Sequence, residues 1–156
     1  MGDPNLFTVE VCFQLALAMT LGLVIGFERE HRRKAAGMRT FALVTLGATL
    51  FTVLSVEGFT PFATATGVDP SRIASQIVIG MGFIGGGLIV LRGNQIQGLT
   101  TAAGLWVAAA VGMAIGVRWY NVAVIATLFM LFIMWVVRLV EEKVPRVPKS
   151  LANKAK

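Results

Sequence analysis

The sequence predicts an all-α polytopic membrane protein, a bundle of five transmembrane helices, from its composition, its apolar segments and the charges beside them. Of the 156 residues, 56% are hydrophobic and only 14% are charged, whereas a soluble domain has about 25% charged residues. So few charges cannot cover a globule in water, but they suit a surface solvated by lipid. The net charge of +6 does not indicate nucleic acid, because the basic residues cluster beside apolar segments, as they do at membrane flanks.

Five apolar segments account for most of the chain. Most of them approach the ~20 residues that a helix needs to cross ~30 Å of hydrocarbon, and the second is the shortest. The predicted helices are residues 6–27, 41–56, 73–91, 99–117 and 119–140. They form one predicted transmembrane domain, residues 1–143, followed by a short basic cytosolic tail, residues 144–156.

The basic residues predict the orientation of these helices. Cytoplasmic loops carry an excess of lysine and arginine. The loop after the first segment is strongly basic, the residues after the fifth segment are basic too, and the N-terminal flank contains Asp3 but no basic residue. We therefore expect the N-terminus outside and the C-terminus in the cytoplasm.

Small residues recur every four positions, which places them on one face of a helix where another backbone can approach closely. Such grooves predict helix packing and make a dimer the expected oligomer. The predicted packing glycines are Gly22, Gly26, Gly82, Gly86, Gly104, Gly112 and Gly116. The stretch from Gly80 to Gly87 contains five glycines, so it also fits a broken helix that lines a pathway, although tight packing is the favoured interpretation.

Polar side chains at the two ends of the segments form two candidate sites. On the outer side, Glu10 could bind an ion or simply reach the headgroups, and Glu10 or Asp69 could pair with Arg72. The candidate outer residues are Glu10, Gln14, Asp69, Arg72 and Gln76. On the cytoplasmic side, three regions could meet as a polar cluster, unless the arginines only anchor in headgroups and Thr100 only caps a helix. The cytoplasmic candidates are Glu28, Arg29, Arg39, Thr40, Arg92, Asn94, Thr100 and Thr101.

Enzymatic chemistry has little support in the sequence. Cys12 is the only cysteine and His31 the only histidine, and neither has partners that suggest a nucleophile–base pair or a metal site. Only Glu10 lies well inside an apolar segment, so no acidic channel for magnesium is evident. We therefore predict no enzyme activity and no cofactor. The metal ligands stay unknown, with magnesium as a conceivable ligand or signal, and a membrane-bound hydrolase is the least favoured interpretation.

Several short motifs occur in a specific order over about residues 20–117. They include Gly26-Phe27-Glu28-Arg29-Glu30, Gly37-Met38-Arg39-Thr40, Asp69-Pro70-Ser71-Arg72, the glycine-rich stretch Gly80 to Gly87, and Gly98-Leu99-Thr100-Thr101 followed by Trp106. In this order and spacing the sequence resembles the MgtC/SapB family of bacterial inner-membrane proteins. It departs from the family pattern Arg-Thr-His, because Phe41 follows Arg39-Thr40.

The resemblance implies five spanning helices with the N-terminus outside, a multi-pass location in the inner membrane, and a role in adaptation to low magnesium. For virulent members it implies growth inside macrophages and binding to other membrane proteins, including the F-type ATP synthase. Many members have a cytosolic domain after the fifth helix, where only the short basic tail is expected here. Our leading hypothesis is a protein linked to magnesium homeostasis that acts by helix-mediated association with itself or with other membrane proteins. The alternative is a transporter or channel for magnesium or another ion.

Overall fold

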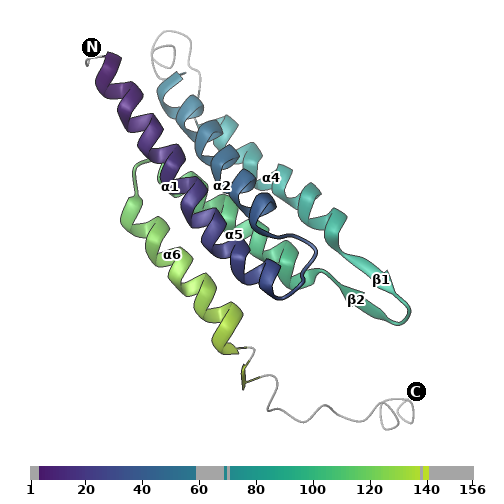
Figure 1. The fold of residues 1–156 in the computed structure, drawn as a ribbon. Coiled ribbons are helices and arrows are strands. Elements are labelled where there is room, and N and C mark those ends of the chain that lie inside the picture. The colour runs from purple at the N-terminus through teal and green to yellow at the C-terminus, as the bar shows by residue number, and fades with distance from the viewer. Residues whose placement is uncertain (1–3, 59–68, 70, 138, 141–156) are drawn as a thin grey trace.

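The computed structural model describes residues 4–58, 69, 71–137 and 139–140. Within these residues, five helices run roughly parallel in one bundle, and a short β-hairpin projects beyond one end of it (Figure 1). The helices are α1 (Pro4–His31), α2 (Met38–Val53), α4 (Ser71–Leu88), α5 (Leu99–Gly116) and α6 (Tyr120–Phe132). Helices α2 and α6 continue into wider π-helical turns, η1 (Leu54–Gly58) and η2 (Ile133–Val137). The predicted all-α class is confirmed.

Four helical segments are long and apolar enough to cross a membrane, and they correspond to the first, second, fourth and fifth predicted helices. They are Phe7–His31, Met38–Gly58, Leu99–Gly116 and Tyr120–Val137. The second has 21 residues, more than the sequence suggested, because η1 extends it through Glu57. The remaining helix, α4, corresponds to the third predicted helix. Its first two turns carry Arg72 and Gln76 and the rest is rich in glycine, so its passage through the membrane stays a prediction.

Helix α5 lies at the centre of the bundle. It contacts each of the other four helices, and 56% of the Leu99–Gly116 segment is buried, compared with 22% of the Tyr120–Val137 segment. The core around it contains Ile25 of α1, Phe41 of α2 and Leu105 of α5, each fully buried. The small residues of α5 explain this position, because they allow several helices to approach one axis closely.

The β-hairpin corrects the predicted end of the third helix. Helix α4 ends at Leu88, and residues 90–92 and 95–97 form antiparallel strands β1 (Val90–Arg92) and β2 (Gln95–Gln97), with Leu91 opposite Ile96. Three successive glycines weaken the helix before Leu88. Gly93 in the turn has a positive φ of 60°, which suits a tight connection between strands.

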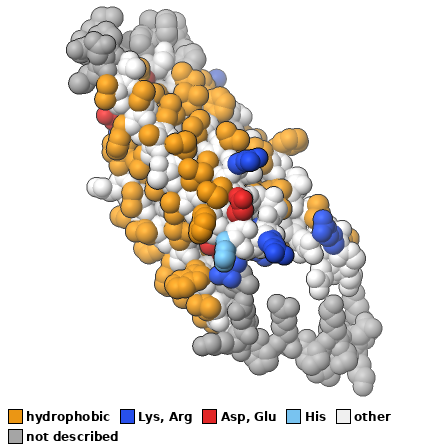
Figure 2. Space-filling model, viewed as in Figure 1, with side chains coloured by type: hydrophobic (Ala, Val, Ile, Leu, Met, Phe, Trp, Pro, Cys, Tyr) orange, Lys and Arg blue, Asp and Glu red, His pale blue; other side chains and the backbone are white. Residues whose placement is uncertain are grey.

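The surface of the bundle has the chemistry expected of a lipid-facing one. Figure 2 shows hydrophobic side chains over much of the visible face, with most of the visible charged side chains toward one end. Large apolar side chains such as Phe7, Phe83 and Phe129 are exposed, and in water so many would favour aggregation. The orientation in the membrane stays a prediction, and the predicted tail, residues 144–156, lies outside the described residues.

Candidate functional site

A cluster of polar side chains joins α1, η1 and the α5–α6 turn at the end of the bundle predicted to lie outside. The Tyr120 hydroxyl donates a hydrogen bond to Glu10 Oε1. Arg118 Nε lies 3.6 Å from the same oxygen, and its Nη1 lies 3.0 Å from Glu57 Oε1. One guanidinium therefore joins two carboxylates from different parts of the chain. We call Glu10, Glu57, Arg118 and Tyr120 the outer cluster.

The backbone of the α5–α6 turn places Arg118 in this cluster. Arg118 has a positive φ of 64°, an uncommon conformation for a residue other than glycine, asparagine or aspartate. Gln14, one turn after Glu10 on α1, is buried and donates hydrogen bonds to the carbonyl oxygens of Ile115 and Gly116 at 2.9 and 3.3 Å. These carbonyls lie at the end of α5, and that of Ile115 also accepts the Arg118 N–H at 2.9 Å. Gln14 thus ties the end of α5 to α1.

The outer candidates do not pair as the sequence suggested. Glu10 meets Arg118, not Arg72. Asp69 Oδ1 instead accepts hydrogen bonds from the Ser71 hydroxyl at 2.8 Å and the Ser71 N–H at 2.9 Å. The carboxylate therefore caps the start of α4. The two bonds from Ser71, with attraction from Arg72, hold the pKa of the Asp69 carboxyl below its ordinary value. Arg72 and Gln76 are exposed on α4.

The predicted cytoplasmic candidates fall into two groups. Where α1 ends and α2 begins, the buried Arg29 pairs with Glu28, which also accepts a bond from Arg32 Nε at 3.2 Å. The carboxylate of Glu30 accepts the Met38 N–H at 3.0 Å, an otherwise unpaired donor at the start of α2. This network closes the α1–α2 connection, where Arg39 is exposed and Thr40 half-buried.

The remaining cytoplasmic candidates lie in the β-hairpin and at the start of α5. Arg92 and Asn94 are exposed in the hairpin, which extends away from the helices (Figure 1). Thr100 is exposed and Thr101 is buried. The N-cap of α5 is Gly98, so Thr100 does not cap it. In the described part of the chain, no hydrogen bond or ion pair between side chains therefore joins the three predicted regions.

Between the two ends, threonine hydroxyls bond the helices together. Thr45 Oγ1 donates to the Ala18 carbonyl oxygen at 2.7 Å, and Thr49 Oγ1 donates to that of Gly112 at 2.8 Å. Both threonines are fully buried, and in the described part of the chain every buried side-chain nitrogen and oxygen has a hydrogen-bond partner. Sequence reasoning missed these residues, although Thr45, Thr49 and Thr52 recur on one face of an apolar segment.

Most of the predicted packing glycines lie at contacts between helices of the same chain. A Cβ at Gly22 would lie 2.7 Å from Ala42 Cα, and one at Gly26 would lie 2.9 Å from the Gly37 carbonyl oxygen. A Cβ at Gly112 would lie 2.8 Å from Ala48 Cβ, and one at Gly116 would lie 2.5 Å from Thr52 Cβ. Gly104 faces the Met134 side chain of η2. These glycines let α1 and α5 pack directly against α2 and let α5 pack against the end of α6.

The glycines of α4 behave differently. A Cβ at Gly80, Gly82, Gly86 or Gly87 would meet no atom within 4 Å, whereas one at Gly85 would lie 3.5 Å from Ala102 Cβ. Gly82 and Gly86 therefore contact no other helix among the described residues of the chain, and their packing against another helix stays a prediction. Helix α4 is also continuous through the glycines, so the broken-helix alternative is wrong. The glycine-rich surface of α4 opens outward from the bundle.

Neither polar region has the composition of a metal centre. Within the ranges that the structure describes, no group of three or more histidine, cysteine, aspartate or glutamate side chains could hold a metal ion. The outer cluster contains two carboxylates, and Arg118 bonds to both. The side chains of the outer cluster instead hold α1, η1 and the end of α5 together by ion pairs and hydrogen bonds.

Comparison with known proteins agrees with this architecture. The family model described as the MgtC family matches residues 15–143. The chain belongs to the MgtC family. This MgtC-family chain is 44% identical over 129 residues to YhiD of Escherichia coli K12, described as a candidate magnesium transporter, covering 81% of this chain and 60% of YhiD. It is 36% identical to the protein SapB of Bacillus subtilis, covering 94% of this chain and 68% of SapB. It is 39% identical to the protein MgtC of Salmonella typhimurium, covering 87% of this chain and 56% of that protein.

The MgtC-family chain thus spans about three fifths of the length of YhiD and MgtC. No solved structure matches it. The match to residues 15–143 includes every helix from most of α1 to α6, and confirms the resemblance drawn from the short motifs. Membership and the four apolar helices together make it a membrane protein.

Proposed function

We propose that this protein resides in the bacterial inner membrane, is linked to magnesium homeostasis, and acts by helix-mediated association with itself or with other membrane proteins. The description of YhiD as a candidate magnesium transporter supports the link to magnesium. The resemblance to virulent members adds survival inside host cells as a context and the F-type ATP synthase as a candidate partner. The proposal assigns the chain no catalytic step.

The open glycine surface of α4 is the observation that carries the association. Glycine in a helix interior costs about 1 kcal/mol relative to alanine. Within the chain that cost is offset where a neighbouring backbone approaches, as at Gly112, but Gly82 and Gly86 gain no such contact. Lipid alone gives no reason for glycine there, whereas a second helix packs closely on such a surface.

Two further features of α4 support the same surface. Phe83 is 86% exposed, and an aromatic side chain beside open glycines is suited to fill a groove on a partner helix. Arg72 and Gln76 are exposed on the same helix. Polar side chains in a membrane helix gain from a partner that can accept their hydrogen bonds. We therefore place the association surface on α4 and favour a dimer.

The association proposal predicts that Gly86→Leu weakens self-association without unfolding the protein. A Cβ at Gly86 would meet no atom within 4 Å, so a side chain there starts in open space, but a leucine would hold a partner helix away. Cys12 is exposed on α1 and allows dye labelling. We expect energy transfer between labelled copies in liposomes to require at least a tenfold higher protein-to-lipid ratio for the variant.

Gly47→Leu is the matched control, because Gly47 lies on α2 and a Cβ there also meets no atom within 4 Å. Equal energy transfer for wild type and Gly86→Leu would remove α4 from the association surface. The alternative of transport is separated by a flux assay. Magnesium entry into proteoliposomes, lost on Glu10→Gln, would favour a transporter, and no entry would favour association.

A further inference from the structure

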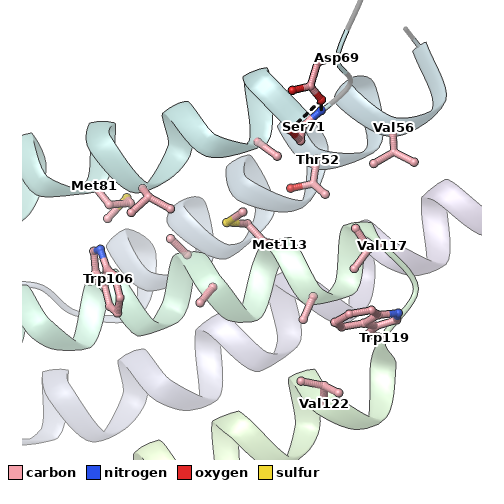
Figure 3. A pocket seen from close by; sticks show the side chains of 15 residues that line it. Thr52, Val56, Asp69, Ser71, Met81, Trp106, Met113, Val117, Trp119 and Val122 are labelled. Carbon is pink, nitrogen blue, oxygen red and sulfur yellow. Dashed lines mark hydrogen bonds between the residues drawn. The ribbon is translucent and has the colours of Figure 1, made fainter. Parts of the chain in front are cut away.

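An apolar groove lies between α4 and α5, beside η1 and the start of α6, and neither polar region described above accounts for it. Its volume is about 810 Å³, within the ~300–1,000 Å³ typical of ligand sites. Figure 3 shows Met81 and Trp106 at one end, and Asp69, Ser71, Val117 and Trp119 toward the other. The groove therefore runs along the helices and becomes polar only near one end.

The groove lies to one side of a contact between α4 and α5. They are in contact where Gly85 meets Ala102, and the groove begins beyond that contact, at Met81 and Trp106. From Trp106 to Val117 the α5 backbone rises about 16 Å at ~1.5 Å per residue. One leaflet of a ~30 Å hydrocarbon core is about 15 Å deep. The groove thus matches the depth of one leaflet and not that of the whole bilayer.

This length decides between two apolar occupants. A transmembrane helix of a partner would need a complementary surface through the full thickness of the membrane. The groove instead ends near the middle of the membrane. An acyl chain of a phospholipid needs only one leaflet. Ala109, Ala110 and Ala114 line the groove, and their small side chains leave space for a flexible chain. Thr52 donates its hydroxyl to the Ala48 carbonyl oxygen, so its polar atom is already bonded.

The polar end of the groove carries the carboxylate of Asp69. Asp69 lines it and is fully exposed there, with one carboxylate oxygen accepting both hydrogen bonds from Ser71. Arg118, the cation of the nearby outer cluster, already bonds to Glu10 and Glu57. The Asp69 carboxylate, whose Oδ1 is held by Ser71 and which is also attracted by Arg72, adds negative charge at the headgroup level, where it can attract a cationic group. The Trp119 indole at the same end is typical of the interface between lipid and water.

We infer that this groove holds one acyl chain of a phospholipid with an ammonium headgroup, and that the ammonium lies against Asp69. The acyl chain fills the groove between α4 and α5, and the headgroup lies at the level of Trp119. Bound in this way, the lipid would hold α4 at its distance from α5. Because the site lies on the inner side of α4 and the glycines open outward, it is separate from the proposed association surface.

The test is native mass spectrometry of the detergent-solubilised protein after equilibration with phosphatidylethanolamine or phosphatidylglycerol. We expect one retained phospholipid per chain, with phosphatidylethanolamine preferred. Ala110→Phe fills the groove and should lower retention at least tenfold. Ala103→Phe is the matched control, because Ala103 is exposed seven residues earlier on nearly the same face of α5 but does not line the groove. Asp69→Asn keeps an oxygen for Ser71 and should abolish only the headgroup preference.

Each other outcome overturns the inference. Retention by Ala110→Phe equal to wild type would place the lipid elsewhere, and absence of any retained phospholipid would leave no lipid site. A second polypeptide or second copy lost from the complex on Ala110→Phe would identify the groove as a helix-docking site. Should Ala110→Phe fail to fold, a Trp135→Phe protein is mixed with one equivalent of chain-brominated phospholipid. Quenching of the emission of Trp106 and Trp119, which flank the groove, would support the inference, and unquenched emission would overturn it.

Discussion

Replacing Gly112 with leucine is expected to lower the thermal stability of the single chain drastically, through the contact between α5 and α2. A Cβ at Gly112 would lie 2.8 Å from Ala48 Cβ and 3.1 Å from the Thr45 carbonyl carbon. Backbone atoms cannot move aside as the end of a flexible side chain can. Overpacking a well-packed core typically costs about 1–3 kcal/mol, and leucine adds far more than one methylene, so we expect at least about 3 kcal/mol.

The same substitution also breaks a hydrogen bond between helices. Thr49 Oγ1 donates to the Gly112 carbonyl oxygen at 2.8 Å, and separating α5 from α2 removes this bond. Such bonds in membrane proteins contribute about 0.6 kcal/mol on average and up to about 1.7 kcal/mol. Gly112→Ala adds only the Cβ. The variant should therefore lose less stability than Gly112→Leu, but more than a variant substituted at an open site.

The measurement is the midpoint of thermal unfolding in detergent, followed by circular dichroism and by monodispersity on size exclusion. Gly47→Leu is the control, since a Cβ there meets no atom within 4 Å, and its midpoint should stay close to that of wild type. A Gly112→Leu protein with the wild-type midpoint and altered oligomeric state would assign Gly112 to an intermolecular surface instead.

This contrast between glycines shows what the sequence could predict and what it could not. Spacing alone placed Gly22, Gly26, Gly82, Gly86 and Gly112 on helix faces suited to close packing. A pattern of small residues does not say whether the partner helix belongs to the same chain. The structure separates them, because α2 fills the space at Gly22, Gly26 and Gly112 and leaves Gly82 and Gly86 open.

The spans were the easiest part to predict. Hydropathy depends on local composition, and the cost of leaving backbone groups unpaired in lipid leaves helices as the main solution. The β-hairpin was missed because Ile89, Val90 and Leu91 are apolar and continue the pattern of α4. The turn signal in Gly93-Asn94, next to the alternating Gln95-Ile96-Gln97, could have revealed it.

The outer cluster could be predicted only in part. Glu10 was conspicuous because a carboxylate in an apolar segment needs an explanation. Its partners, Arg118 and Tyr120, are more than 100 residues away in the sequence, and no local rule connects them. Glu57 lies just beyond the predicted second helix, residues 41–56, and is not among the predicted outer residues. The structure shows it on η1 and bonded to Arg118, so the tertiary fold determines which charges pair.

The second large effect is expected from Gly98→Ala, at the connection between the hairpin and α5. Gly98 has a φ of 95°, a region that costs other residues about 1–3 kcal/mol. A Cβ there would also lie 2.8 Å from the Leu88 carbonyl carbon and 3.3 Å from Ile89 Cα. The end of α4 and the N-cap of α5 meet at this point, so relief of the contact would have to move one helix relative to the other. We expect the loss to be about 3 kcal/mol.

Gly93→Ala separates the two causes of this loss. Gly93 also has a positive φ, 60°, but a Cβ there meets no atom within 4 Å. Gly93→Ala should therefore lower the stability only through the strained backbone conformation, by about 1–2 kcal/mol. Gly93→Asn should lower it less, because asparagine tolerates a positive φ. Thermal midpoints should therefore fall in the order wild type, Gly93→Asn, Gly93→Ala, Gly98→Ala. Equal midpoints for Gly93→Ala and Gly98→Ala would contradict the contact with Leu88, because strain alone would then account for both.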